Sequence, residues 1–190
     1  MSDKYITDQK IEKTDFTGSG FEKGEFENCE FINCQFNELN LSYCSFTDCV
    51  FDNCDLSMVQ LQHTTLNNVS FKNCKLLGVN FSNCNPFLLS FLFEHCQLNY
   101  ASFYKIKAHH TKFLNCIMEE VDMVEADFTK ALFDACSLSN AVFDGTILEN
   151  ADLRTAVHFS IDPERNRLRQ AKFSTYGLAG LLQKYNLDID

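Results

Sequence analysis

The sequence has no tryptophan, two prolines and seven glycines in 190 residues. It has no apolar run of about eighteen residues, so no membrane-spanning helix is predicted, and its N-terminus lacks the apolar segment of a signal peptide. We therefore expect a soluble, cytoplasmic protein. Basic residues are also scarce: 16 Lys and Arg stand against 26 Asp and Glu, a formal net charge of −10. This balance disfavours direct binding to nucleic acid, because affinity for phosphate comes from basic side chains.

No motif of an enzyme site is present either. The sequence contains no glycine-rich phosphate loop, no HExxH zinc motif and no GxSxG nucleophile elbow. Its five histidines are dispersed except for the neighbours His109 and His110, whose side chains would diverge. We expect a non-enzymatic protein, with no catalytic residues, no metal and no cofactor.

What the sequence does contain is a repeat of five residues. From Phe16 to Phe81 every fifth residue is Phe or Leu, in fourteen consecutive positions, and the residue two places earlier is mostly small. A period of five fits neither an α-helix nor a simple strand. It indicates a chain that turns a corner every five residues and points one large and one small side chain inward.

The ten cysteines all occupy the small inward position of this repeat. They are Cys29, Cys34, Cys44, Cys49, Cys54, Cys74, Cys84, Cys96, Cys116 and Cys136. A free cysteine packs as a small hydrophobe, whereas zinc needs four ligands that converge tetrahedrally. We interpret the cysteines as core residues.

Units such as Cys29-Glu30-Phe31-Ile32-Asn33 and Ala151-Asp152-Leu153-Arg154-Thr155 resemble the A(D/N)LXX units of the pentapeptide-repeat family. The resemblance implies an all-β fold, a right-handed quadrilateral parallel β-helix (a pentapeptide-repeat solenoid) of about seven coils. Four repeats per coil would place like residues twenty apart, stacked at about 4.8 Å. The predicted core ladder is Phe31, Phe51, Phe71 and Phe91, with Cys34, Cys54 and Cys74.

The phase of the repeat slips between Phe81 and Leu98, which are separated by three repeats plus two residues. We predict an N-terminal cap at 1–13, a first β-helix block at 14–84, a hinge or bulge at 85–95, a second block at 96–157 and a C-terminal turn region with a helix at 158–190. The hinge carries more apolar residues than the inward positions accommodate. Either they fill the join, or they form a partner-binding apolar patch of Phe87, Leu88, Leu92 and Phe93.

After Leu153 the large inward residues stop, and a short α-helix is predicted after Ser174 or Thr175, which are suitable N-caps. Its apolar face would be Leu178, Leu181, Leu182 and Tyr185. A short helix is marginal by itself, so this face must dock. It either caps the last coil or pairs with a second copy across a two-fold axis.

This ending, the break at mid-chain and the stretch Leu98 to Phe103 resemble the Qnr and MfpA proteins of the same family. The resemblance implies a rod-shaped homodimer, joined through the C-terminal helix, that mimics duplex DNA and binds the type II topoisomerases DNA gyrase and topoisomerase IV, the basis of quinolone resistance. Qnr proteins also project loops that matter for protection, whereas this chain has room for only a two-residue insertion within its repeats.

Two functions follow as hypotheses. In the first, the acidic rod mimics DNA and binds a type II topoisomerase; in the second, it is a scaffold for a protein partner that the sequence does not identify. Acidic residues cluster near the start, at Glu22, Glu25, Glu27 and Glu30, and again later in the chain. The candidate partner-binding residues are Glu119, Glu120, Asp122, Glu125 and Asp127. Residues five apart lie on different walls, so each cluster is expected to spread around the rod.

Overall fold

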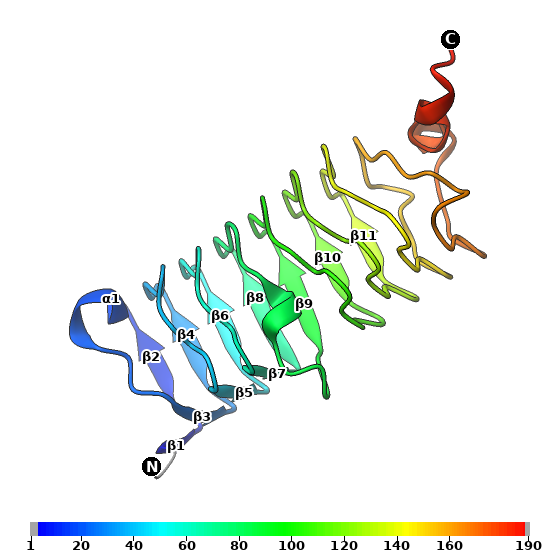
Figure 1. The fold of residues 1–190 in the computed structure, drawn as a ribbon. Helices are drawn as coiled ribbons and strands as arrows, with labels where there is room; N and C mark the ends of the chain where they lie inside the picture. The colour runs from blue at the N-terminus through cyan, green and yellow to red at the C-terminus, as the bar shows by residue number, and fades with distance from the viewer. Residues whose placement is uncertain (1–3, 189–190) are drawn as a thin grey trace.

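The inward-facing residue at every fifth position folds the chain into four walls around one apolar core, as the computed structural model shows (Figure 1). The structure describes residues 4–188, so the ends of the predicted cap and C-terminal region, 1–3 and 189–190, lie outside it. Successive coils stack in parallel, which confirms the parallel β-helix. We name each wall by its large inward residue in the second coil: the Phe26, Phe31, Phe36 and Leu41 walls.

A left-handed backbone residue makes most corners. Asn33, Asn53 and Asn73, which stack along one corner of the rod, have φ values of 56°, 53° and 52°. Asparagine tolerates this region better than most residues because its short polar side chain bonds locally. The Asn53 amide donates to the Asn33 side chain one coil away, so the corner is stabilised along the rod axis as well.

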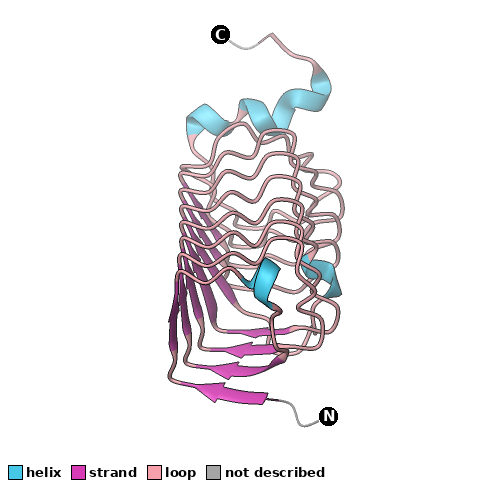
Figure 2. Ribbon diagram, turned by 90° about the vertical axis from the view of Figure 1, so that its left-hand side faces the viewer, coloured by secondary structure: helices cyan, strands magenta, loops and turns pink. Residues whose placement is uncertain are grey.

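Two adjacent walls carry the regular strands (Figure 2). The four-stranded sheet of the Phe26 wall consists of β1 (Lys4–Thr7), β3 (Gly24–Glu27), β5 (Ser45–Thr47) and β7 (Thr65–Asn67). The seven-stranded sheet of the Phe31 wall consists of β2 (Lys10–Glu12), β4 (Glu30–Ile32), β6 (Val50–Asp52), β8 (Val69–Lys72), β9 (Phe91–Glu94), β10 (Lys112–Leu114) and β11 (Leu132–Asp134). The second sheet follows the rod past the point where the first one ends.

The other two walls are held by isolated parallel bridges between coils, such as Gln35 with Asp55 and Asn40 with Gln60. Helical turns are short and peripheral. They are α1 (Phe16–Ser19), η1 (Phe81–Asn83), η2 (Thr175–Gly177), α2 (Ala179–Leu182) and η3 (Gln183–Tyr185). None of the helices among residues 4–188 has the length and apolar character that crossing a membrane requires.

The phase slip is a two-residue insertion on one wall. Asn85 still bonds Thr64, about one coil earlier, but β9 pairs with β8 at an offset of twenty-two, so that Phe93 lies over Phe71 and Phe91 over Val69. The predicted ladder is therefore corrected: Phe93 stacks on Phe71 with ring centroids 5.2 Å apart, and Phe91 is buried two positions earlier. The twenty-residue spacing used to predict the ladder does not hold here, because the two inserted residues precede β9.

The repeat also extends beyond the two predicted blocks at both ends, where Ile6, Ile11, Leu168 and Phe173 pack against the core. Residues 4–12, predicted as a cap, form β1 and β2 of the first coil. At the other end, bridges join Ile147 to Arg167 and Asp152 to Lys172, so a further coil follows Leu153. Its inward positions are taken by smaller or shifted residues, among them Phe159, Ile161 and Asn166.

Candidate protein-interaction surfaces

The Asp or Asn that precedes many large inward residues has a structural role. Its side-chain oxygen accepts a hydrogen bond from the backbone N–H two residues later, as Asp55 does from Ser57, Asp122 from Val124 and Asp127 from Thr129, each at 3.0 Å. This local turn is the ordinary preference of Asp and Asn. An acidic residue at this position is therefore partly engaged within its own wall.

The five acidic residues predicted as a binding site do not come together. Glu119 and Glu120 follow Met118 on the Phe36 wall, Asp122 and Glu125 lie on the Leu41 wall, and Asp127 lies on the Phe26 wall. Several are also paired: Lys105 lies 3.4 Å from Glu125, and Asn99 donates to Glu119 at 3.2 Å.

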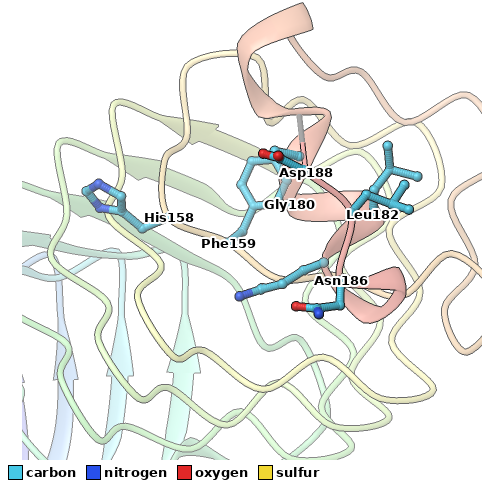
Figure 3. A pocket seen from close by; sticks show the side chains of 9 residues that line it. His158, Phe159, Gly180, Leu182, Asn186 and Asp188 are labelled. Atoms are coloured by element: carbon cyan, nitrogen blue, oxygen red, sulfur yellow. The ribbon is translucent and has the colours of Figure 1, made fainter. Parts of the chain in front are cut away.

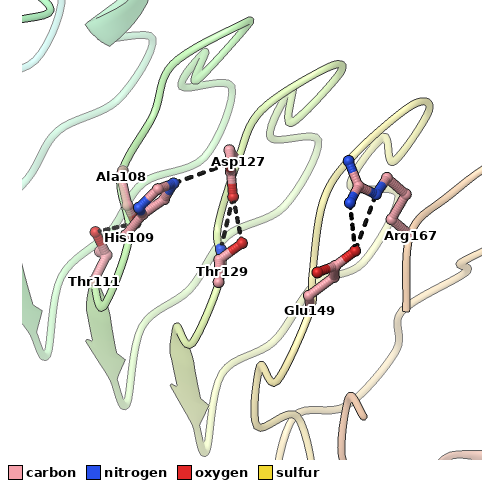
Figure 4. Close-up of polar contacts among 7 residues, drawn as sticks. All are labelled: Ala108, His109, Thr111, Asp127, Thr129, Glu149 and Arg167. Carbon is pink, nitrogen blue, oxygen red and sulfur yellow. Dashed lines mark hydrogen bonds and ion pairs between the residues drawn. The ribbon is translucent and has the colours of Figure 1, made fainter. Parts of the chain in front are cut away.

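Asp127 is the most engaged of the five (Figure 4). Its carboxylate accepts from the Thr129 hydroxyl at 2.6 Å and lies 2.9 Å from His109 Nε2. Burial raises the pKa of Asp127, but the hydrogen bonds from Thr129 and His109 outweigh it, and the pKa lies below its ordinary value. On a neighbouring coil Arg167 donates to Glu149 at 2.6 Å, so several acids of this half are paired with bases, whereas Glu119, Glu120 and Asp122 form no ion pair among residues 4–188.

The first half of the rod differs, because no Lys or Arg occurs between Lys23 and Lys72. This stretch holds seven acids, here called the acidic band: Glu25, Glu27, Glu30, Glu38, Asp48, Asp52 and Asp55. All seven are exposed or half-buried. None forms an ion pair with a Lys, Arg or His of residues 4–188, although some accept neutral hydrogen bonds. In the sequence, the acidic band could have been found from its lack of Lys and Arg rather than from the number of its acidic residues.

The predicted apolar patch is only half formed. Phe87 and Leu88 project from the insertion and are 71% and 58% exposed. Leu92 is half-buried, and Phe93 is fully buried because it continues the phenylalanine ladder. Phe93 is thus removed from the patch, and the exposed part of the patch consists of Phe87, Leu88 and the neighbouring Pro86.

The predicted C-terminal helix forms three short helical turns that dock on the last coil. Ser174 caps the first turn by accepting from the Gly177 N–H at 3.2 Å. Gly180 lies against Phe159, and its carbonyl accepts from the Ile161 N–H at 3.0 Å. A side chain at position 180 would meet the Phe159 carbonyl oxygen at 2.4 Å, so the close approach requires glycine.

Part of the apolar face of this segment stays exposed. Leu181 packs on the core and Leu182 is half-buried, whereas Leu178 and Tyr185 are 47% and 52% exposed. Tyr185 also donates to Glu164 at 3.0 Å. A cavity of about 520 Å³ lies beside α2, with His158, Phe159 and Leu182 in its lining (Figure 3). The segment therefore caps the rod and still presents apolar side chains.

Six of the cysteines stack in one column beside the Phe36 wall. They are Cys34, Cys54, Cys74, Cys96, Cys116 and Cys136, in register across the insertion. The thiols donate to carbonyls of the preceding coil, for example Cys54 to Phe31 at 3.2 Å and Cys74 to Phe51 at 3.3 Å. Within residues 4–188, no three His, Cys, Asp or Glu residues are placed to bind a metal ion.

These features define a pentapeptide-repeat β-helix. The sequence model of the pentapeptide repeat region matches residues 24–91 and 88–158, and the chain belongs to this family. No curated protein matches it in sequence.

Solved structures of the same fold resemble it at low sequence identity. A trypsin-treated variant of QnrB1, a plasmid-mediated fluoroquinolone resistance protein, is 19% identical with a TM-score of 0.72, over 98% of this chain and 92% of that one. HetL, a pentapeptide repeat protein involved in heterocyst differentiation regulation in the cyanobacterium Nostoc, is 16% identical with a TM-score of 0.57, over 89% and 85%.

Proposed function

We propose that this protein is a non-catalytic DNA mimic whose acidic band binds the DNA-binding surface of a type II topoisomerase. The observation that carries the proposal is the linear charge density of the band. Residues 24–71 occupy 2.4 coils of twenty residues, or about 12 Å of the rod at about 4.8 Å per coil. Seven carboxylates over this length give one charge per about 1.6 Å, against one per about 1.7 Å along duplex DNA.

None of these acids forms an ion pair within residues 4–188, although Lys10, Lys72 and Lys75 of the adjacent coils are the register neighbours of Glu30, Asp52 and Asp55. A surface that binds DNA carries Lys and Arg, which gain from releasing the counterions of an anionic partner. The second half of the rod also contains many acids, but Arg154, Arg165 and Arg167 pair with Asp152, Asp144 and Glu149. We therefore assign binding to the band rather than to Glu119 through Asp127. The likeness to QnrB1, named for fluoroquinolone resistance, supports this class of partner.

A DNA gyrase supercoiling assay tests the proposal, with the purified protein titrated in at two salt concentrations, with and without a fluoroquinolone. We expect inhibition that weakens as salt rises, because screening reduces attraction between exposed charges. Drug rescue is a separate readout, since the chain has no long loop within its repeats. Absence of any effect at either salt concentration would contradict the proposal.

Charge-neutral variants locate the surface. Replacing Glu25, Glu27 and Glu30 by Gln should weaken inhibition and reduce its salt dependence. The matched control replaces Glu119, Glu120 and Glu125 by Gln, which removes the same charge from the second half and should have the smaller effect. Equal effects of the two triple variants would indicate attraction to net charge rather than to the band.

A second candidate is a scaffold role, which the exposure of Phe87 and Leu88 favours. Large apolar side chains that project from a rigid insertion are suited to a protein partner. Binding through them would be insensitive to salt. It should be lost in a Phe87→Ser, Leu88→Ser variant that retains gyrase inhibition.

A further inference from the structure

None of residues 4–188 covers the N-terminal end of the rod. Ile6, Ile11, Phe16 and Phe21, the large inward residues of the first coil, are only partly buried, whereas Phe26, Phe31, Phe36 and Leu41 directly above them are buried. A cavity of about 260 Å³ lies among the first-coil residues. The opposite end differs, because the C-terminal segment packs over its last coil through Gly180 and Leu181.

The first coil also presents backbone hydrogen-bonding groups at this end. In β4, the Glu30 N–H and the Ile32 carbonyl point toward the first coil and bond Gln9 and Lys13 at 2.8 and 2.9 Å. The same groups in β2 belong to Lys10 and Glu12, one coil earlier in the register. The Glu12 carbonyl accepts from the Thr14 hydroxyl at 3.1 Å, which leaves its second lone pair, and no strand among residues 4–188 pairs with that edge of β2. An exposed strand edge of this kind is a template for another strand.

The charge of the first coil is compatible with contact between the first coils of two copies of the chain. Residues 4–23 contain four acids, Asp8, Glu12, Asp15 and Glu22, and four lysines, Lys4, Lys10, Lys13 and Lys23, so this coil is formally neutral in a chain of net charge −10. The acidic band begins immediately above it. The N-terminal end is thus the part of the first half that a second copy approaches without repulsion between like charges.

We propose that two copies dock head to head at this end, with β2 of one pairing antiparallel to β2 of the other about a two-fold axis at Ile11. In this register Lys10 lies opposite Glu12 of the second copy, and Glu12 opposite its Lys10. Opposite charges directly across an antiparallel pair are favourable. The outward N–H and carbonyl groups of Lys10 and Glu12 form the hydrogen-bonded pairs of the ladder. The two sets of half-buried apolar residues close over each other.

Charge reversal tests this register. Lys10→Glu and Glu12→Lys each place like charges opposite one another in a homodimer and should weaken self-association about tenfold or more. An equimolar mixture of the two variants restores opposite charges at both positions and should associate like the wild type. The matched control Lys112→Glu makes the same charge change in mid-rod on the same wall and should have no effect. Both variants also remove the ion pair that Lys10 and Glu12 form within one chain at 2.7 Å, and Lys10→Glu lies beside Glu30 as well. The mixture does not restore that internal pair, so recovery in the mixture reports pairing between copies.

Energy transfer between dyes at the N-termini is the readout, measured across a concentration series with the full chain. The pairings from Lys4 to Lys172 span about eight coils of twenty residues. A dimer through the C-terminal segment would therefore hold the N-termini about 80 Å apart, two rod lengths at about 4.8 Å per coil, and would give little transfer. We expect transfer for wild type and for the mixture, and its loss for each single variant alone. No concentration-dependent transfer in the wild type, or unchanged transfer in both single variants, would overturn the proposal.

Discussion

At the scale of single residues, the stacked phenylalanines of the core ladder make close aromatic contacts between coils. Phe51 stacks on Phe31 at 4.8 Å and on Phe71 at 5.3 Å, nearly parallel to both. Phe51→Ala should lower the free energy of unfolding by about 3–5 kcal/mol, from lost burial and the remaining cavity. Urea unfolding followed by far-ultraviolet circular dichroism is suitable because the chain has no Trp. Phe87→Ala is the matched control, since Phe87 is exposed; equal midpoints for the two variants would contradict the inward placement of Phe51.

The buried thiols should be chemically silent in the folded protein. Burial raises the pKa of the Cys84 thiol to about 12, and that of Cys49 to about 12. Hydrogen bonds from neighbouring cysteines lower the pKa of Cys54 and Cys116, but these thiols are buried as well. Thiolate is the reactive form and must be reached by the reagent, so at neutral pH a thiol reagent should label almost no cysteine in native protein and all ten after denaturation. Rapid labelling of one or more cysteines without denaturant would indicate that the coils open locally.

At the scale of elements, the five-residue period predicted the four-walled helix because one large side chain per wall is what fills the core. The size of the phase slip was also predictable, and residues 86–90, which take both extra residues, lie within the predicted bulge at 85–95. The ladder residue was wrong, because the insertion precedes β9 and Phe93 rather than Phe91 joins the ladder. The last coil was not predicted from the sequence, because His158 and Pro163 occupy two of its large inward positions. Its signal lay in the small positions, where Ala156, Ile161 and Asn166 are buried.

The Ala108 repeat shows a similar exchange. Ala108 is small for a large inward position, and from its size alone a local distortion would be expected there. The structure keeps the wall regular: Ala108 bonds Asp127 at 2.9 Å, and the preceding small position holds a buried Ile106. A pattern that assigns one large and one small residue to fixed positions misses this pair. The two inward side chains of a repeat fill the same part of the core, so Ile106 compensates for the small Ala108.

For the C-terminal segment, the prediction is that removing residues 177–190 converts a C-terminal dimer into a smaller species while the β signal remains. Light scattering with circular dichroism measures both. Gly180→Val is a sharper variant, since its side chain would collide with the Phe159 backbone and displace the segment. An unchanged mass after deletion would leave the segment as a cap alone.

At the scale of the whole molecule, acid stability follows from many small contributions. The Arg154 hydrogen bond lowers the pKa of Asp152, the Lys184 hydrogen bond lowers that of Asp162, and Asp127 is lowered as described. Carboxyl groups with depressed pKa values stabilise the fold above their unfolded pKa of about 3.9 and lose that contribution as pH falls through the lower folded value.

We therefore expect the protein to stay folded at its isoelectric point of about 4.9, where solubility is lowest, and to lose stability below about pH 4. Thermal melts from pH 7 to pH 3 measure this. In Asp152→Asn, which retains an oxygen acceptor for the Arg154 N–H, the acid-induced loss should be smaller. A midpoint that already falls steeply between pH 7 and pH 5 would contradict the assignment to carboxyl groups.

The insertion at residues 86–90 separates two properties of the rod that a strict repeat would link. Both extra residues are absorbed on the Phe26 wall, and the cysteine column passes the same level in register, with Cys96 above Cys74. Each corner is thus a junction at which sequence can be added to one wall without changing the pitch of the other three. Such a scaffold can acquire new surface features one at a time. The length of the rod and the axial spacing of all its other side chains stay constant.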